Sequence, residues 1–219
     1  MYSIAKCTLP SNLTILAVED VMNGNWLSTD EAQDVAGSLR HALRTVRHID
    51  EDTHAWKWVL LALHSALQGA CVAYLTTTAP PIGAVSKQNA AEWLAYLDAS
   101  RTDTAASPPK AKIMALPDLL KAARKPHSAG DRSNSEGVTI SDAEYQWLLR
   151  IHHDVRNQFT HFEPKGWGLE VSGISDFAKL VARIVGEIFT IGWAFRRLDP
   201  PERDEMRMNL SILATADWA

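Results

Sequence analysis

Apolar residues recur with helical spacing near the start of the chain. Ser28-Thr29-Asp30-Glu31 has the form of a capping box, in which Ser28 is the N-cap and Glu31 follows three residues later. Behind it, apolar residues follow at steps of three and four: Ala32, Val35, Ala36, Leu39, Ala42, Leu43, Val46 and Ile49. This pattern predicts a helix over about 29–49.

A second and more apolar helix is predicted directly after the first. The acidic turn 50–52 leads to Thr53 as its N-cap, and the apolar run continues to about Leu75. Ala79-Pro80-Pro81 then ends it, because proline cannot continue a helix. Since the turn is short, we expect the two helices to pack as antiparallel neighbours.

The last third of the chain also carries signals for helices. A second capping box, Ser141-Asp142-Ala143-Glu144, opens a helix that ends before Pro164. The segment 164–173, PKGWGLEVSG, allows a short strand or hairpin arm. Ser175 is expected to cap a long helix to about Leu198, and a last helix is predicted over Glu202–Ala216.

These elements predict an all-α fold, an antiparallel bundle of four long helices plus a terminal helix, with little or no strand. We expect one domain over 1–219, with a core bundle at 28–198, a loop-rich insert at 79–140 and a C-terminal helix at 199–219. Within 1–27, the run LTILAVEDVM fits either a helix or a short strand.

The insert differs in composition from the rest. It holds two short predicted helices, Asn89–Asp98 and Pro117–Ala123, between polar stretches rich in Pro and Ser that are typical of mobile loops. From Arg101 to Arg132 it carries seven Lys or Arg against three Asp, within a chain of net charge -4. Two interpretations stay open, a solvated loop or a flexible contact to a polyanion.

Composition narrows the class of protein. With 46% hydrophobic residues the chain can bury a core, and its net charge of -4 argues against a constitutive nucleic-acid coat. Cys7 and Cys71 form no disulfide framework, which favours a reducing compartment and a core position for Cys71. No secretory signal is visible. The apolar run 55–75 contains Lys, His, Ser and Gln, so we expect a soluble, cytoplasmic protein without a membrane span.

The segment VRNQFTHF, 155–162, carries the candidate chemistry. In an α-helix, His153, Asn157 and His161 would share one stripe, and the long side chain of Arg156 would reach toward it. Arg matches phosphate oxygens with a charged fork of donors, and His moves protons near neutral pH. His153 and His161 are too far apart on a helix to bind one metal ion, so neither a metal nor a cofactor is expected.

Arg156-Asn157-Gln158-Phe159-Thr160-His161 resembles the signature of the HEPN superfamily (higher eukaryotes and prokaryotes nucleotide-binding), over a bundle at roughly 28–198. The resemblance implies a dimeric helical domain and a metal-independent endoribonuclease, such as a toxin or defence effector. It implies that Arg156 binds the scissile phosphate, that His161 transfers a proton and that Asn157 positions both. It also implies that the two motifs of a homodimer face each other, with an antitoxin or nucleotidyltransferase as a further partner.

One branch of that family has a modified Tyr two residues after the His, where this chain has Glu163, so that regulation is not transferred. His153, Lys165 and Trp167 are candidate substrate contacts, and Trp167 would stack on a base. His64, Ser65 and Gln68 form a polar edge that either joins an interhelical network or lines the same cleft.

Two other functions stay open beside the nuclease. One is a HEPN-like dimer that binds nucleotide or RNA without cutting it. The other is a helical interaction scaffold, in which Arg156 pairs with Asp154 or Glu163 and His161 is a helix-terminal histidine favoured by the dipole.

Overall fold

The computed structural model describes residues 29–76, 81–161, 164, 166–191 and 193–218, apart from the side chain of His161. The chain divides into an N-terminal unit, Met1–Asp30, and a helical unit, Glu31–Ala219, to which all the helices described below belong. The predictions for 1–27 and for Ser28 as an N-cap therefore lie outside the described residues. Within the described residues no strand forms, and only an isolated antiparallel bridge joins Val85 to Ile113. The all-α class predicted from the sequence is confirmed.

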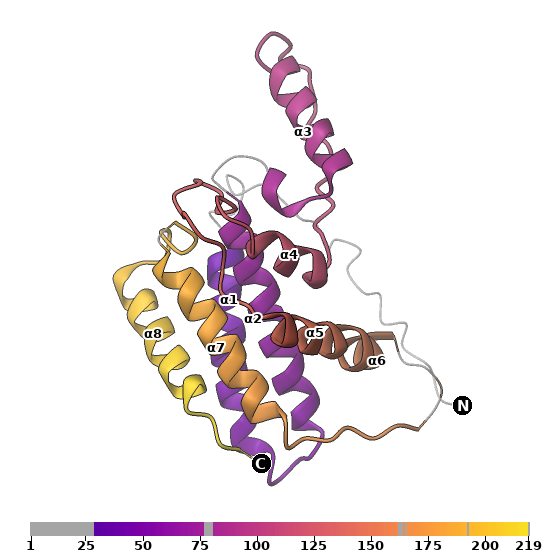
Figure 1. Ribbon diagram of the computed structural model, residues 1–219, viewed down its shortest axis with the longest axis vertical. Coiled ribbons are helices and arrows are strands. Elements are labelled where there is room, and N and C mark those ends of the chain that lie inside the picture. The colour runs from indigo at the N-terminus through magenta and orange to yellow at the C-terminus, as the bar shows by residue number, and fades with distance from the viewer. Residues whose placement is uncertain (1–28, 77–80, 162–163, 165, 192, 219) are drawn as a thin grey trace, which may run out of the picture. The chain divides into compact units, whose positions relative to one another are not determined.

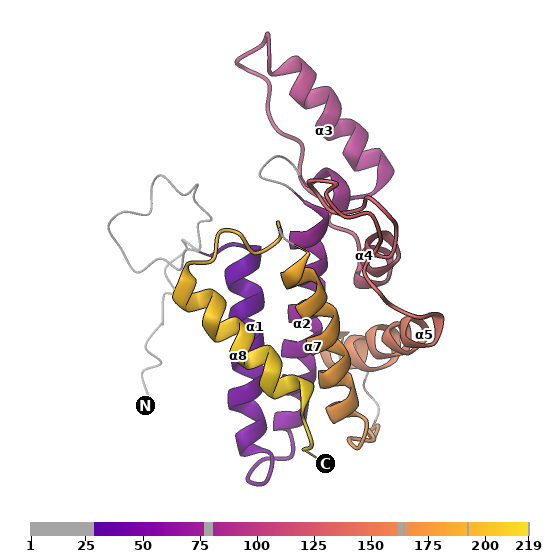
Figure 2. The same ribbon diagram turned by 60° about the vertical axis from the view of Figure 1, so that its left-hand side comes forward.

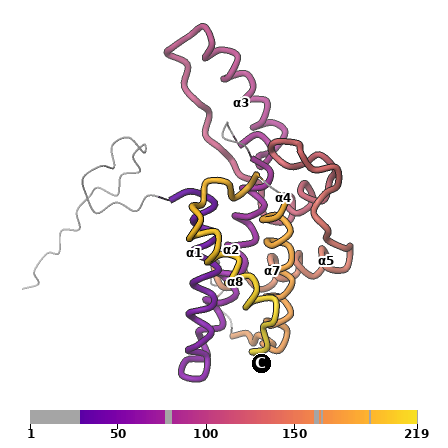
Figure 3. Tube along the Cα trace, turned by 90° about the vertical axis from the view of Figure 1, so that its left-hand side faces the viewer, coloured from indigo at the N-terminus to yellow at the C-terminus, as the bar shows by residue number. Residues whose placement is uncertain are grey.

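Four helices make the bundle: α1 (Glu31–Thr45), α2 (Ala55–Leu75), α7 (Ile174–Thr190) and α8 (Pro200–Ala214). α2 packs against α1 and α7, and α8 closes the ring by packing against both α7 and α1 (Figures 1 and 2). Figure 3 shows α8 between α1 and α7. The terminal helix predicted from the sequence is thus a full member of the bundle.

The direction of the helices follows from their connections. α1 and α2 are antiparallel, as the short turn predicts, and α7 and α8 are antiparallel as well. α2 and α7 run in the same direction, because the long connection after α2 returns the chain to the end of the bundle where α2 began (Figures 1 and 2). Two antiparallel hairpins, α1 with α2 and α7 with α8, therefore lie side by side, and the neighbouring helices α2 and α7 are parallel.

α2 is the central helix. It contacts α1, α7 and also α4 (Leu116–Ala123), so residues around most of its circumference are buried. It is long and apolar enough to cross a membrane, yet 67% of its most apolar window is buried inside the protein. It is therefore a core helix, as expected. Cys71 lies in it, fully buried, and burial raises the pKa of its thiol to about 12.

The insert contributes to the core. Its helices are α3 (Lys87–Ala99), after the short turn η3 (Ile82–Ala84), and α4, whose Leu116, Leu119 and Leu120 are buried against the bundle. Both helices were predicted with shorter bounds. Ser86 caps α3 by accepting a hydrogen bond from the Asn89 N–H.

The segment 124–137, predicted as a mobile loop, is instead fixed to the bundle. Asn134 is buried, its side-chain oxygen accepts from the Ala129 N–H at 2.9 Å, and its Nδ2 donates to Tyr74 Oη on α2 at 2.7 Å. Ser128 Oγ donates to the same phenol oxygen at 3.2 Å. A buried amide is stable only when its hydrogen bonds are made, so these contacts fix the loop conformation.

We expect Tyr74→Phe to lower the free energy of unfolding by about 1–3 kcal/mol, because the buried Asn134 amide loses a partner. Urea unfolding of the variant measures the loss. Tyr145→Phe is the matched control, since the Tyr145 hydroxyl donates only one bond, at 3.3 Å, to the Pro117 carbonyl. Equal losses in the two variants would contradict the anchoring role of Tyr74.

Several helix ends differ from the prediction. Asp52 accepts from the His54 N–H before α2, so the helix begins at Ala55 and Thr53 is not its N-cap. α7 begins after Gly173, and Ser175 lies inside it, where its hydroxyl accepts from the Trp218 N–H at 2.8 Å. α7 also ends at Thr190, well before Leu198.

Candidate functional site

The helix that carries the motif is divided into three parts. It runs as α5 (Asp142–Arg150), a π segment η4 (Ile151–Arg156) and α6 (Asn157–His161), and it lies across the bundle beside α2 (Figures 1 and 2). The predicted capping box is present, with Ser141 and Glu144 bonded reciprocally. π segments within α-helices occur frequently at functional sites.

The π segment changes which side chains share a face. Its hydrogen bonds join residues five apart rather than four, so the helix is locally underwound and the α-helical spacing of His153, Asn157 and His161 does not hold across it. His152 is buried, whereas His153 is exposed and contacts the His152 ring edge-on, with centroids 5.0 Å apart. The single stripe expected from the sequence is therefore broken within η4.

Arg156 lines a surface cavity of about 420 Å³ between the motif helix, α1 and α2. His64, Ser65 and Gln68 of α2 line the same cavity, and His64 also bonds to His152 of the motif helix, so both alternatives left open by the sequence hold for His64. Asp34 and Glu31 of α1 stand at another part of its wall. The cavity therefore combines one guanidinium, one imidazole and two carboxylates.

His64 and His152 form a buried pair behind Arg156. Their Nε2 and Nδ1 atoms are 2.9 Å apart, and the rings stack with centroids at 5.2 Å. Burial, His152 and Arg156 together lower the pKa of His64 from 6.5 to about 3. Burial, His153 and Arg156 lower the pKa of His152. Both imidazoles are thus neutral at pH 7, and one nitrogen of the pair donates to the other.

Arg156 is positioned from its own helix. Its Nη1 donates to Asn157 Oδ1 at 3.0 Å, and Thr160 Oγ1 donates to its backbone carbonyl at 3.1 Å. Among the described residues no carboxylate forms an ion pair with Arg156, so the alternative of pairing with Asp154 is not seen. Its remaining guanidinium N–H groups are available to an anion.

Phe159 of the motif, Trp167 and Trp58 make up an aromatic cluster, to which Trp58 is joined through the Lys57 ammonium. The Phe159 and Trp167 rings are 4.8 Å apart, and Lys57 Nζ lies 4.8 Å from the Trp58 ring and 5.8 Å from the Phe159 ring. Trp58 and Trp167 are 50% and 41% exposed, which is unusual for residues of this size. The cluster therefore leaves two large aromatic side chains partly exposed to solvent.

No protein-family model, curated protein or solved structure matches this chain. The HEPN resemblance therefore rests on the sequence motif alone.

The structure brings some of the predicted site residues into contact and leaves others outside the described residues. Arg156 and Asn157 contact each other, and Trp167 joins the aromatic cluster. His161 is the last residue of α6, but its side chain lies outside the described residues, as does Lys165. In the part of the chain that the structure describes, no group of three or more His, Cys, Asp or Glu side chains is arranged to hold a metal ion.

Sequence reasoning missed the partnership of His152 with His64 and the membership of Trp58 in the aromatic cluster. The helical spacing of His64, Ser65 and Gln68 indicated a polar edge, but not the residue that faces it. No Pro or Gly in 151–156 signals the π segment.

Proposed function

We propose that this protein is a metal-independent endoribonuclease of the HEPN type, whose site is built from Arg156, Asn157 and His161. The observation that carries the proposal is the guanidinium of Arg156, which lines an open cavity, is oriented by Asn157 and forms no ion pair among the described residues. Such a group is suited to binding a phosphodiester.

In the proposed reaction the 2′-oxygen of RNA attacks the adjacent phosphorus, and the bond to the 5′-oxygen breaks. A base removes the 2′-hydroxyl proton, and an acid gives a proton to the departing 5′-oxygen. The products are a 2′,3′-cyclic phosphate and a 5′-hydroxyl end. Arg156 would neutralise charge on the non-bridging oxygens, and His161 would transfer a proton.

The charges of the cavity orient the substrate. Glu31 and Asp34 repel a polyanion from their part of the wall, so the phosphate would lie at the Arg156 end. Trp58 and Trp167 in the aromatic cluster would stack on bases next to the cleaved bond. In this proposal His153 and Lys165 are further substrate contacts.

A homodimer through the motif face would supply the second proton-transfer group, because each chain carries one His161. The proposal includes a toxin or defence role in the cytoplasm, with an antitoxin or nucleotidyltransferase as partner. The exposed aromatic cluster is the apolar surface that such a dimer would cover in part.

The test is cleavage of a mixed-sequence RNA in the presence of EDTA by the wild type and by His161→Ala, purified in parallel. We expect cyclic-phosphate products from the wild type alone, with both proteins folded by circular dichroism. Equal cleavage by the two proteins would identify a contaminant or another site. Cleavage that needs an added divalent ion would contradict the proposed chemistry.

A second candidate is a protein that binds nucleotide or RNA at this cavity without cutting it. The volume of about 420 Å³ favours it, because this is within the range typical of small-ligand pockets. It predicts a rise of the melting temperature with a mononucleotide, lost in Arg156→Ala, and no cleavage products.

A further inference from the structure

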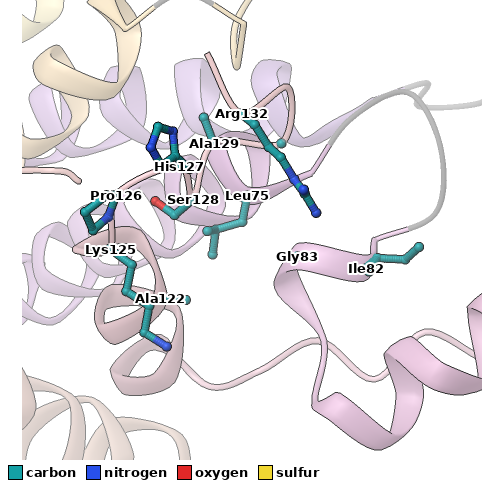
Figure 4. A pocket seen from close by; sticks show the side chains of 11 residues that line it. Leu75, Ile82, Gly83, Ala122, Lys125, Pro126, His127, Ser128, Ala129 and Arg132 are labelled. Atoms are coloured by element: carbon teal, nitrogen blue, oxygen red, sulfur yellow. The ribbon is translucent and has the colours of Figure 1, made fainter. Parts of the chain in front are cut away.

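A second hollow, of about 450 Å³, lies at the C-terminal end of α2, on residues that the proposed nuclease site does not use. Its walls are the end of α2, the turn η3 and the loop that follows α4 (Figure 4). Leu75 and Ile82 give it an apolar side, and Lys125, His127 and Arg132 give it a basic side. No Asp or Glu is among the described residues that line it.

The basic side chains are not neutralised locally. Within the described part of the chain, neither Lys125 nor Arg132 forms an ion pair with a carboxylate. The neighbouring Asp131 carboxylate accepts instead from the N–H and the hydroxyl of Ser133, at 3.1 and 2.8 Å. Figure 4 shows the ends of Lys125 and Arg132 on two sides of the hollow, with Leu75 between them in this view.

The loop backbone that carries these cations is held in a strained form. His127 and Arg132 both have φ of 55°, in the left-handed region that residues with a side chain seldom adopt. The His127 N–H donates to the Asn134 carbonyl at 3.2 Å, and the Arg132 N–H donates to the Ala129 carbonyl at 2.8 Å. Strained residues held in this way concentrate at binding sites.

The dipole at the end of α4 can explain the position of Lys125 but not that of Arg132. Lys125 follows the C-terminus of α4, where a cation is favoured by the helix dipole without any ligand. Arg132 lies at no helix end, yet it reaches the same hollow from a left-handed position. Two cations that line one hollow from a pinned loop, without a carboxylate among the described lining residues, suit an anion.

We propose that this hollow binds the phosphate group of a small phosphorylated ligand between Arg132 and Lys125, with the rest of the ligand against Leu75 and Ile82. Arg132 offers a planar fork to two phosphate oxygens, and Lys125 adds a point charge. His127 adds an N–H donor at the rim. This site goes beyond the proposed nuclease function and does not depend on it.

The test is thermal stabilisation and calorimetric titration with inorganic phosphate and with adenosine 5′-monophosphate, at constant ionic strength. The variants are Lys125→Gln and Arg132→Asn, the latter chosen because Asn tolerates the left-handed backbone. Lys121→Gln on the exposed surface of α4 is the matched control for loss of one positive charge. Arg156→Ala separates this site from the nuclease site.

We expect both probes to raise the melting temperature of the wild type, of Lys121→Gln and of Arg156→Ala. In Lys125→Gln and Arg132→Asn the affinity should fall by about tenfold or more. Tighter binding of the nucleotide than of phosphate would identify an organic phosphate as the ligand, and equal binding would identify free phosphate. Either result supports the anion site.

Three results would overturn the proposal. Neither probe binds the wild type, or binding survives unchanged in Lys125→Gln and Arg132→Asn, or it is lost in Arg156→Ala instead. If neither phosphate nor adenosine 5′-monophosphate binds and the two variants weaken only the binding of single-stranded RNA, the basic loop is a polyanion contact and the small-ligand proposal is wrong.

Discussion

Replacing Arg156 with alanine is expected to slow RNA cleavage by about a hundredfold or more, the usual cost of removing one donor to a charged transition state. The fold should change little, because the guanidinium of Arg156 makes only one hydrogen bond within the described chain, to its neighbour Asn157. Initial rates of cleavage of a labelled RNA, with unfolding measured on the same samples, test both statements.

Two further variants sharpen the test of Arg156. Arg156→Lys keeps the charge but loses the fork and the bond geometry to Asn157, so an intermediate rate is expected. Arg150→Ala removes an exposed arginine one segment earlier on the same helix and should leave the rate unchanged. An equal loss in Arg150→Ala and Arg156→Ala would show that general charge, rather than the site, governs cleavage.

The second large effect is expected on the free energy of unfolding, when the buried pair of His64 and His152 is broken. His64→Leu leaves the Nδ1 of the buried His152 without its partner, and we expect a loss of about 1–3 kcal/mol in the free energy of unfolding. His152→Leu should cost a similar amount for the same reason. The double variant removes both polar groups, so its loss should be clearly smaller than the sum of the two single losses. Additive losses would contradict a direct His64–His152 bond.

The same pair predicts a dependence of stability on pH. His64 has a pKa of about 3 in the folded protein against an ordinary 6.5, so below pH 6.5 the unfolded chain binds more protons than the folded one. Stability is therefore unaffected above pH 6.5 and falls as the pH decreases below it, by up to about 1.4 kcal/mol per pH unit for each such histidine.

This dependence can be isolated from other groups. Glu144 and Glu205 also have lowered pKa values. The stability that these carboxylates contribute to the folded protein is lost only as the pH falls through and below their ordinary pKa of 4.5. Between pH 6.5 and 5, the double variant His64→Leu/His152→Leu should show a flatter profile than the wild type. Parallel profiles in this window would mean that the pair is not buried as neutral imidazoles. Glu31 and Asp34 face the same cavity and are unchanged in all these variants.

The local signals in the sequence determined what could be predicted of the fold. The capping box Ser141–Glu144 and the steps of three and four in α1 depend only on neighbours along the chain, and both appear in the structure. Ser175 shows the limit of such signals, since a distant partner, Trp218, binds its hydroxyl and another residue begins the helix. The membership of α8 in the bundle likewise depends on the distant apolar faces of α1 and α7.

For the candidate site, the sequence identified Arg156 and Asn157 as a pair and His64, Ser65 and Gln68 as a polar edge. It could not show that His152 turns inward to His64, because the π segment has no recognised sequence pattern and alters the helical spacing. The Pro and Ser content of 124–137 predicted a mobile loop, whereas the buried bond between Asn134 and Tyr74, 60 positions apart in the sequence, fixes this loop to the bundle.

The position of α8 at the end of the chain has a consequence for synthesis of the protein on the ribosome. The hairpin of α1 and α2 and the motif helix, which enclose the Arg156 cavity, emerge before α8, whereas α8 alone closes the bundle between α1 and α7. A nascent chain that stops before Pro200 therefore holds every described residue of that cavity while an apolar face of the bundle still stands open. The order of translation therefore supplies all the described cavity-lining residues before the helix that closes the core.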